Sequence, residues 1–186
     1  MAVIREKFLI IDGSLEKMIN QIHKIEAERL RIALMCGCDS STTVIAWADS
    51  IINLQFDVDY LVIDISLTRP EKIKELISLL RKLGQETDHD DALRCVLGRA
   101  SFLAGKGEFN LRNFAKWLYF TESTGWDLPS DLNFVYSTDD EYSLAEDGVF
   151  GSLEDVDAMF LNNLNEFESE QSASPDWYSA ALHTNR

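Results

Sequence analysis

Apolar side chains recur three or four positions apart in successive stretches of this chain, a spacing that places them on one face of an α-helix. The stretches end at glycines such as Gly37, Gly84 and Gly107, and others begin at capping residues such as Ser14 and Ser152. Only 3 prolines and 9 glycines interrupt the 186 residues, which favours long regular elements over a loop-rich sandwich. The pattern predicts an all-α single domain of stacked antiparallel helices.

The same spacing gives approximate bounds for each helix. Pro70 suits the first position of one of them, and Ser152 with Asp155 three residues later is typical of a capping box at the start of the last. The predicted helices cover residues 15–36, 44–52, 70–83, 87–105, 110–124, 129–137 and 152–167. We expect residues 1–167 to form one domain with an acidic part over 117–167, and residues 168–186, which lose the periodicity, to form a loosely docked tail.

Two short apolar segments leave the choice between strand and helix open. KFLIIDGS, residues 7–14, suits a short N-terminal strand or an extended lead-in. In DVDYLVIDISL, residues 57–67, the β-branched residues favour a strand, whereas the flanking helices and Asp57 as a cap favour a short buried helix. We expect a helix at Tyr60–Leu67.

Several classes of protein do not fit the sequence. No segment reaches the about 18–20 uncharged apolar residues of a membrane span, and the N-terminal apolar run is interrupted by charged residues at positions 5–7 and lacks a signal-peptide cleavage site. We therefore expect a cytoplasmic protein that does not bind membranes. Cys36, Cys38 and Cys95 form no C-x-x-C motif, and an odd number of cysteines indicates free thiols.

No catalytic or cofactor motif is present in the sequence. There is no glycine-rich phosphate loop, no H-E-x-x-H and no G-x-S-x-G, and the three histidines lack metal-ligand spacing. Asp147-Gly148 with Glu154 copies part of a calcium loop, but alignment on Gly148 places Ala145 at a ligand position. We predict no catalytic residues, no cofactor and no bound metal.

Negative charge is concentrated in the C-terminal part of the chain. The net charge is −15, and residues 117–186 contribute −14 of it because they hold 15 acidic residues and only one basic residue, Arg186. The basic residues of 1–116 are balanced by nearly equal numbers of acidic ones. No basic stripe is left over, which argues against direct nucleic-acid binding.

The acidic residues are densest in STDDEYSLAEDGVFGSLEDVD, residues 137–157, which holds eight carboxylates and no Lys or Arg. Apolar residues interleave with the acids, so the segment is expected to be ordered. Its acids then form either a solvated face or a surface that meets a basic partner, whose complementary charge would steer association. The candidate partner-binding residues are Tyr136, Asp139, Asp140, Glu141, Tyr142, Glu146, Asp147, Phe150, Glu154, Asp155 and Asp157.

Two stretches, VIAWADSIINLQFDVDYLVIDISL and LAEDGVFGSLEDVD, resemble small bacterial proteins associated with toxin-neutralising immunity genes. The resemblance implies a protein that binds and blocks a toxin domain, often a nuclease, and that is not an enzyme. It implies structural roles for the residues of the first motif, which are Trp47, Ala48, Asp49 and Leu67. The alternatives are a carboxylate-rich metal-dependent enzyme, for instance with Mg²⁺, and a cytoplasmic adaptor unrelated to toxins.

The partial calcium motif generates a first prediction. Because Ala145 has no side-chain oxygen, residues 143–154 should not bind Ca²⁺ specifically. Isothermal titration calorimetry with Ca²⁺ should show no saturable micromolar binding. Saturable binding that disappears in Glu154→Gln would contradict the prediction.

Overall fold

The computed structural model describes residues 21–54, 58–123, 126 and 128–173, and this part of the chain is helical without a strand. The predicted all-α class is thus confirmed. The first element is a helix over residues 21–36. The others are α2 (Ser41–Leu54), α3 (Tyr60–Leu67), α4 (Ile73–Leu83), α5 (His89–Gly105), α6 (Leu111–Ser123), the 3₁₀ helix η1 (Ser130–Leu132), α7 (Phe134–Glu146), α8 (Leu153–Asn165) and the 3₁₀ helix η2 (Glu168–Ala173).

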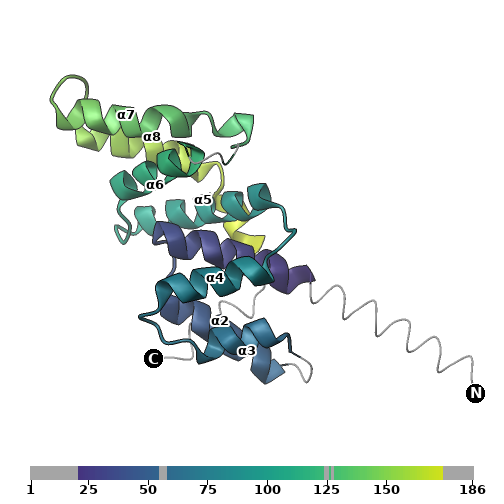
Figure 1. The fold of residues 1–186 in the computed structure, drawn as a ribbon. Coiled ribbons are helices and arrows are strands. Elements are labelled where there is room, and N and C mark those ends of the chain that lie inside the picture. Colours follow the sequence, from purple (N-terminus) through teal and green to yellow (C-terminus); the bar gives the residue numbers. More distant parts are fainter. Residues whose placement is uncertain (1–20, 55–57, 124–125, 127, 174–186) are drawn as a thin grey trace, which may run out of the picture.

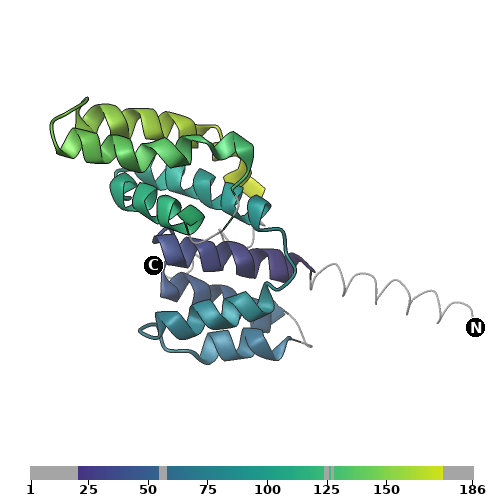
Figure 2. The same ribbon diagram turned by 45° about the horizontal axis from the view of Figure 1, so that its top comes forward.

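The helices lie in a stack (Figures 1 and 2). α2 and α3 lie at one end with α4 against them, and α7 and α8 pack together at the other end with α6 beneath them. The helix over residues 21–36, drawn in purple, lies between these two groups and is called the central helix below.

The central helix contributes to two separate hydrophobic cores. Ala27, Leu30 and Leu34 pack with buried residues of α2, α3 and α4. Ile32 and Ala33 pack with buried residues of α5, α6, α7 and α8. A helix that serves two cores has little room for a solvent-facing side, and residues 26–34 are all buried.

Four of these nine buried residues are charged, and each finds a partner of opposite charge three positions away. Arg29 Nη2 lies 2.6 Å from Glu26 Oε2, while Arg31 donates to both Glu28 oxygens from Nε at 2.7 Å and Nη2 at 2.5 Å. Burial raises the pKa of Glu26, and the guanidinium of Arg29 opposes that shift. The pairing makes the burial of four charges tolerable, because an isolated buried charge costs several kcal/mol.

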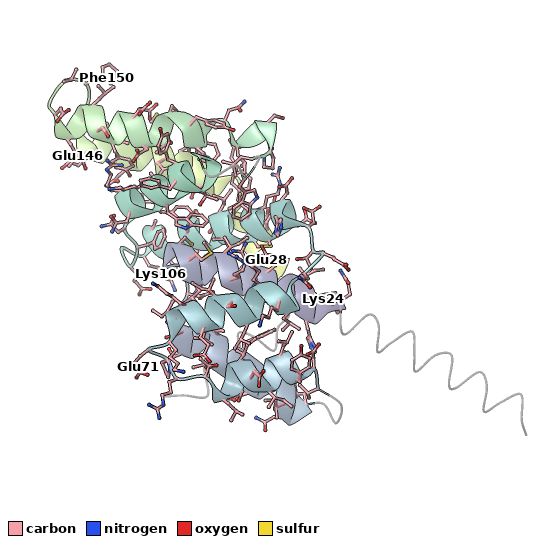
Figure 3. All side chains as sticks on the ribbon, in the orientation of Figure 1. Lys24, Glu28, Glu71, Lys106, Glu146 and Phe150 are labelled. Carbon is pink, nitrogen blue, oxygen red and sulfur yellow. The ribbon has the colours of Figure 1, made fainter. Side chains whose placement is uncertain are left out.

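Glu28 also fixes the neighbouring elements. His89 Nδ1, at the start of α5, lies 2.6 Å from Glu28 Oε1. Gly84, after α4, approaches so closely that a Cβ there would lie 3.1 Å from both Cβ and N of Glu28. The Arg31 guanidinium lies 5.8 Å from the Trp126 ring centroid. The connection between α4 and α5 and the segment after α6 therefore converge on one buried ion pair (Glu28 is labelled in Figure 3).

Several helix bounds differ from the sequence-based expectation. α3 is helical as expected, with Asp59 as its N-cap, while Asp57 lies outside the described residues. Pro70 lies in a turn, and α4 begins three residues later at Ile73, so the prediction for Pro70 was wrong. Residues 7–14, the candidate strand, lie outside the described residues.

The C-terminal part differs more. The short helix expected from Pro129 is the 3₁₀ turn η1, and the chain then continues into α7, which periodicity had not predicted beyond residue 137. The expected loose tail does not begin at residue 168, because η2 packs against α5. Residues 174–186 lie outside the described residues.

The buried pair in the central helix generates a second prediction. Glu28→Ala should lower the free energy of unfolding by about 3 kcal/mol, because it leaves the Arg31 charge buried without its carboxylate. Glu75→Ala is the matched control, since Glu75 also pairs with a cation three residues away, Lys72 at 2.8 Å, but on the surface. That change should cost no more than about 0.5 kcal/mol. Urea denaturation measures both, and equal effects would contradict the prediction.

Candidate functional site

The eleven candidate residues lie on one helical hairpin, formed by α7, the loop 147–152 and α8. Its inner face buries Val135 and Thr138 of α7 and Val156, Phe160 and Leu164 of α8. The other sides of the two helices are exposed, and most of the candidate carboxylates lie there. The hairpin ends the stack, and its loop projects from it (Figure 1).

The loop at the tip of the hairpin has a fixed backbone and exposed apolar side chains. The amides of Val149 and Phe150 both donate to the carbonyl of Leu144, at 2.9 and 3.3 Å. Gly148 and Gly151 hold positive φ angles of 66° and 69°, which favour glycine. Val149 and Phe150 are nevertheless 69% and 71% exposed, so hydrogen bonds hold the backbone while the apolar side chains face outward (Phe150 in Figure 3).

The far side of the loop is held by the predicted capping box, which is confirmed. Asp155 N donates to Ser152 Oγ at 3.2 Å, and Ser152 N donates to Asp155 Oδ2 at 3.3 Å. The Asp155 carboxylate is thus occupied in starting α8. Its first role is structural.

Arg112 of α6 neutralises part of the acidic surface. Its Nε donates to Glu146 Oε1 at 2.9 Å, its Nη1 pairs with Asp139, and its Nη2 donates to Ser143 Oγ at 3.3 Å. The hydrogen bond from Arg112 holds the pKa of Glu146 below its usual range. Asp139 and Glu146 therefore belong to an ion-pair network between α6 and α7.

Tyr142 is also a structural residue. It is only 1% exposed, its hydroxyl donates to Asp157 Oδ1, and the Arg112 guanidinium lies 5.3 Å from its ring centroid. Burial, reinforced by the hydrogen bond to Asp157, raises the pKa of Tyr142 well above its usual value. Tyr142, a candidate partner-binding residue, is thus buried, because its ring packs into the core between α7 and α8.

The remaining candidates, apart from Glu141, face solvent. Asp140, Asp147 and Glu154 are exposed and form no ion pair within the described residues, and Phe150 is the most exposed aromatic of the set. Tyr136 is exposed farther along α7, on its first turn. Glu141 is half-buried, with one carboxylate oxygen that has no hydrogen-bond partner within the described residues.

Sequence reasoning missed the cations that meet this surface. Arg112 and Arg94 precede residue 117 in the sequence, and Arg94 Nη2 donates to Asp131 at 2.7 and 2.9 Å. The sequence contains no local signal for these pairs, because their partners lie 27 to 37 residues away. It also missed Val149, although its position between Gly148 and Phe150 marks an apolar turn.

A groove lies beside the loop end of the hairpin, between the end of α5, the start of α6, the end of α7 and the start of α8. It has a volume of about 480 Å³, and its lining includes Phe109, Leu111, Leu153 and Leu161 with the Arg112–Tyr142–Asp157 network. Leu153, the first residue of α8, is exposed at this groove. The apolar surface therefore extends from the tip toward α5.

Within the described residues, no cluster of three His, Cys, Asp or Glu side chains is arranged to hold a metal ion. In the same part of the chain, no helix combines the length and apolar character needed to cross a bilayer.

The Arg112 network generates a third prediction. Arg112→Gln should lower the free energy of unfolding at pH 7. The lowered pKa of Glu146 means that its contribution is present above the ordinary glutamate pKa of about 4.3 and is lost as the pH falls below it. The difference between variant and wild type should therefore disappear in acid. Urea denaturation at a series of pH values measures this.

The control for that series is Arg81→Gln, because Arg81 is exposed on α4 and has no ion pair within the described residues. It should change stability little at any pH. A difference between Arg112→Gln and wild type that persists unchanged into acid would show that Arg112 acts by packing alone.

Comparisons of the chain with known protein families, curated proteins and solved structures found no match. The function therefore has to be inferred from the surfaces themselves. The one that stands out is the α7–α8 tip, where a fixed loop exposes two apolar side chains among carboxylates.

Proposed function

We propose that this chain is a binding protein that inhibits a toxin domain by covering a basic surface on it with the α7–α8 tip. The observation that carries the proposal is the tip itself, where Val149 and Phe150 are exposed on a hydrogen-bonded loop between Asp147 and Glu154. An apolar centre with a charged rim is the usual anatomy of a protein–protein interface.

The rigid loop supports tight binding. Because the amides of Val149 and Phe150 are already bonded to Leu144, little backbone freedom is lost when a partner covers the loop. Phe150 is then the residue expected to insert into a pocket on the partner, since exposed aromatics at the centre of a patch contribute most to binding energy.

The charge supports a basic partner. Arg112 pairs with Asp139 and Glu146, but Asp140, Asp147 and Glu154 stay exposed without an ion pair in the described part of the chain. A nuclease toxin has a positive surface for its nucleic-acid substrate, and these carboxylates would attract it. The resemblance of two stretches of the sequence to immunity proteins supports the toxin over other basic partners.

The state of the cysteines supports a cytoplasmic site of action. Cys36, Cys38 and Cys95 are free, and Cys38 is buried. Burial raises the pKa of Cys95 and so disfavours its reactive thiolate. Unpaired thiols of this kind suit a reducing compartment.

The proposal generates a fourth prediction. The full chain should co-purify with the product of the gene next to its own and relieve that product's toxicity on co-expression. Surface plasmon resonance should then show two different mutant effects. Asp140→Asn, Asp147→Asn and Glu154→Gln together should slow association about tenfold at low salt, with little effect at high salt, because rim charges act on encounter.

Phe150→Ser should instead raise the dissociation rate by about 30-fold, the equivalent of a hot spot of about 2 kcal/mol. The matched control is Leu54→Ser, since Leu54 is also 71% exposed but lies at the opposite end of the stack. It should leave both rates unchanged. Co-purification without any rescue from toxicity would favour the adaptor interpretation, and unchanged rates in all tip variants would exclude the tip as the binding site.

A further inference from the structure

The helix α3 has one face in the core and an opposite apolar face that nothing covers in the described part of the chain. Leu61, Val62 and Ile65 are buried. Tyr60 and Leu67 are 69% and 77% exposed, and Ile63 between them is exposed as well. The spacing of three and then four residues puts these three side chains on one stripe. An exposed apolar stripe of this kind marks an interaction site.

The exposure of this stripe differs from what the sequence predicts for α3. The apolar composition of Tyr60–Leu67 predicted a short buried helix, and the resemblance implied a structural role for Leu67. Within the described residues, α3 lies at the end of the stack and Leu67 belongs to neither core, so the outer face of α3 is not buried as its composition predicted. A second molecule against α3 would complete the burial.

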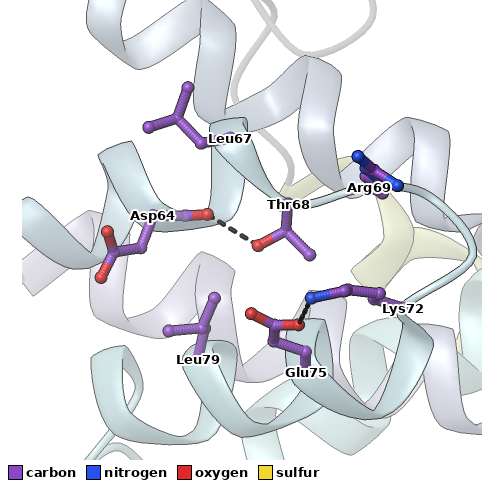
Figure 4. A pocket seen from close by; sticks show the side chains of 7 residues that line it. All are labelled: Asp64, Leu67, Thr68, Arg69, Lys72, Glu75 and Leu79. Atoms are coloured by element: carbon purple, nitrogen blue, oxygen red, sulfur yellow. Dashed lines mark hydrogen bonds and ion pairs between the residues drawn. The ribbon is translucent and has the colours of Figure 1, made fainter.

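A groove adjoins the C-terminal end of the stripe. It lies between α3 and α4, has a volume of about 600 Å³ and includes Leu67 and Leu79 in its lining, with charged side chains around them (Figure 4). Lys72 pairs with Glu75 at 2.8 Å across its rim. Arg69 also lines it and forms no ion pair within the described residues.

The two ends of α3 are complementary to each other. The N-terminal end carries the projecting ring of Tyr60 beside the carboxylate of Asp59, and the C-terminal end carries the groove and Arg69. Seven residues, about 10 Å along a helix, separate Tyr60 from Leu67. If a second copy packs its α3 antiparallel to the first, each Tyr60 meets the groove of the other copy, and each Asp59 comes near the other copy's Arg69.

We propose that this face of α3 is the interface of a homodimer with two-fold symmetry. Two-fold symmetry requires one surface to carry both halves of each contact, and α3 does so in shape, in apolarity and in charge. The exposed Leu54, at the end of α2, and Ile73, at the start of α4, add apolar surface beside it. Asp59, Asp64 and Glu75 on the same side argue against an anionic membrane surface as the occupant.

Sedimentation velocity of the full chain, from low to high micromolar concentration, tests the proposal. The wild type should sediment as a dimer with a concentration-dependent monomer fraction. Leu67→Glu and Tyr60→Ser should each raise the dimer dissociation constant at least tenfold, with the helical circular dichroism spectrum unchanged. A wild type that stays monomeric at the highest concentration overturns the proposal, as does a dimer that both variants leave intact.

The control is Phe150→Ser, which removes an equally exposed apolar side chain at the other end of the stack and should leave the dimer intact. If Phe150→Ser dissociates the dimer, self-association runs through the acidic tip, and the α3 interface is excluded. The dimer does not depend on the proposed function, because the two use surfaces at opposite ends of the molecule.

Charge reversal tests the antiparallel arrangement itself. Arg69→Glu and Asp59→Lys should each weaken the dimer, since each puts like charges together. The double variant should dimerise more tightly than either single variant, because it brings opposite charges together again. Asp59→Lys removes the N-cap of α3 in the single and in the double variant alike, so loss of the cap does not explain such a gain. A double variant no tighter than the weaker single one would exclude the contact between Asp59 and Arg69.

Discussion

The burial of Glu28 is the constraint on which the rest of this fold depends. Its carboxylate lies in a helix that is covered on both sides, and it is satisfied only because Arg31 follows three residues later and His89 arrives from α5. Gly84 lets the chain pass close to it. The ion pair thus fixes where α4 ends and α5 begins, and the central helix can separate two cores without leaving a buried charge unpaired.

The division into two cores gives the molecule two distinct ends. On one side of the central helix, α2, α3 and α4 bury aliphatic side chains around Trp47 and leave the outer face of α3 exposed. On the other side, aromatic rings such as Phe114 and Phe160 pack together and support the α7–α8 hairpin. A dimer formed through α3 would therefore leave both acidic tips free, and one assembly could bind two partner molecules.

The acidic surface is less negative than its sequence suggests, because folding brings cations to it. Arg94 and Arg112, which precede the acidic part in the sequence, reach Asp131, Asp139 and Glu146. Asp147 and Glu154, which flank the exposed loop, stay without an ion pair within the described residues. Unpaired carboxylates beside an exposed apolar loop are the arrangement that a charge-steered binding surface needs.

The sequence by itself determined the helices, because each needs only local information, which is the spacing of apolar residues and the caps at its ends. Ser152 with Asp155 shows this, since the capping box lies where the sequence places it. α7 was predicted only as far as residue 137, because its buried stripe continues through Thr138 and Tyr142, whose polar groups hide the periodicity. Only the tertiary structure decided which candidates are available to a partner. Tyr142 turned into the core, Asp139 and Glu146 paired with Arg112, and Phe150 and Leu67 stayed exposed, because burial and ion pairing depend on residues that are distant in the chain and adjacent only after folding.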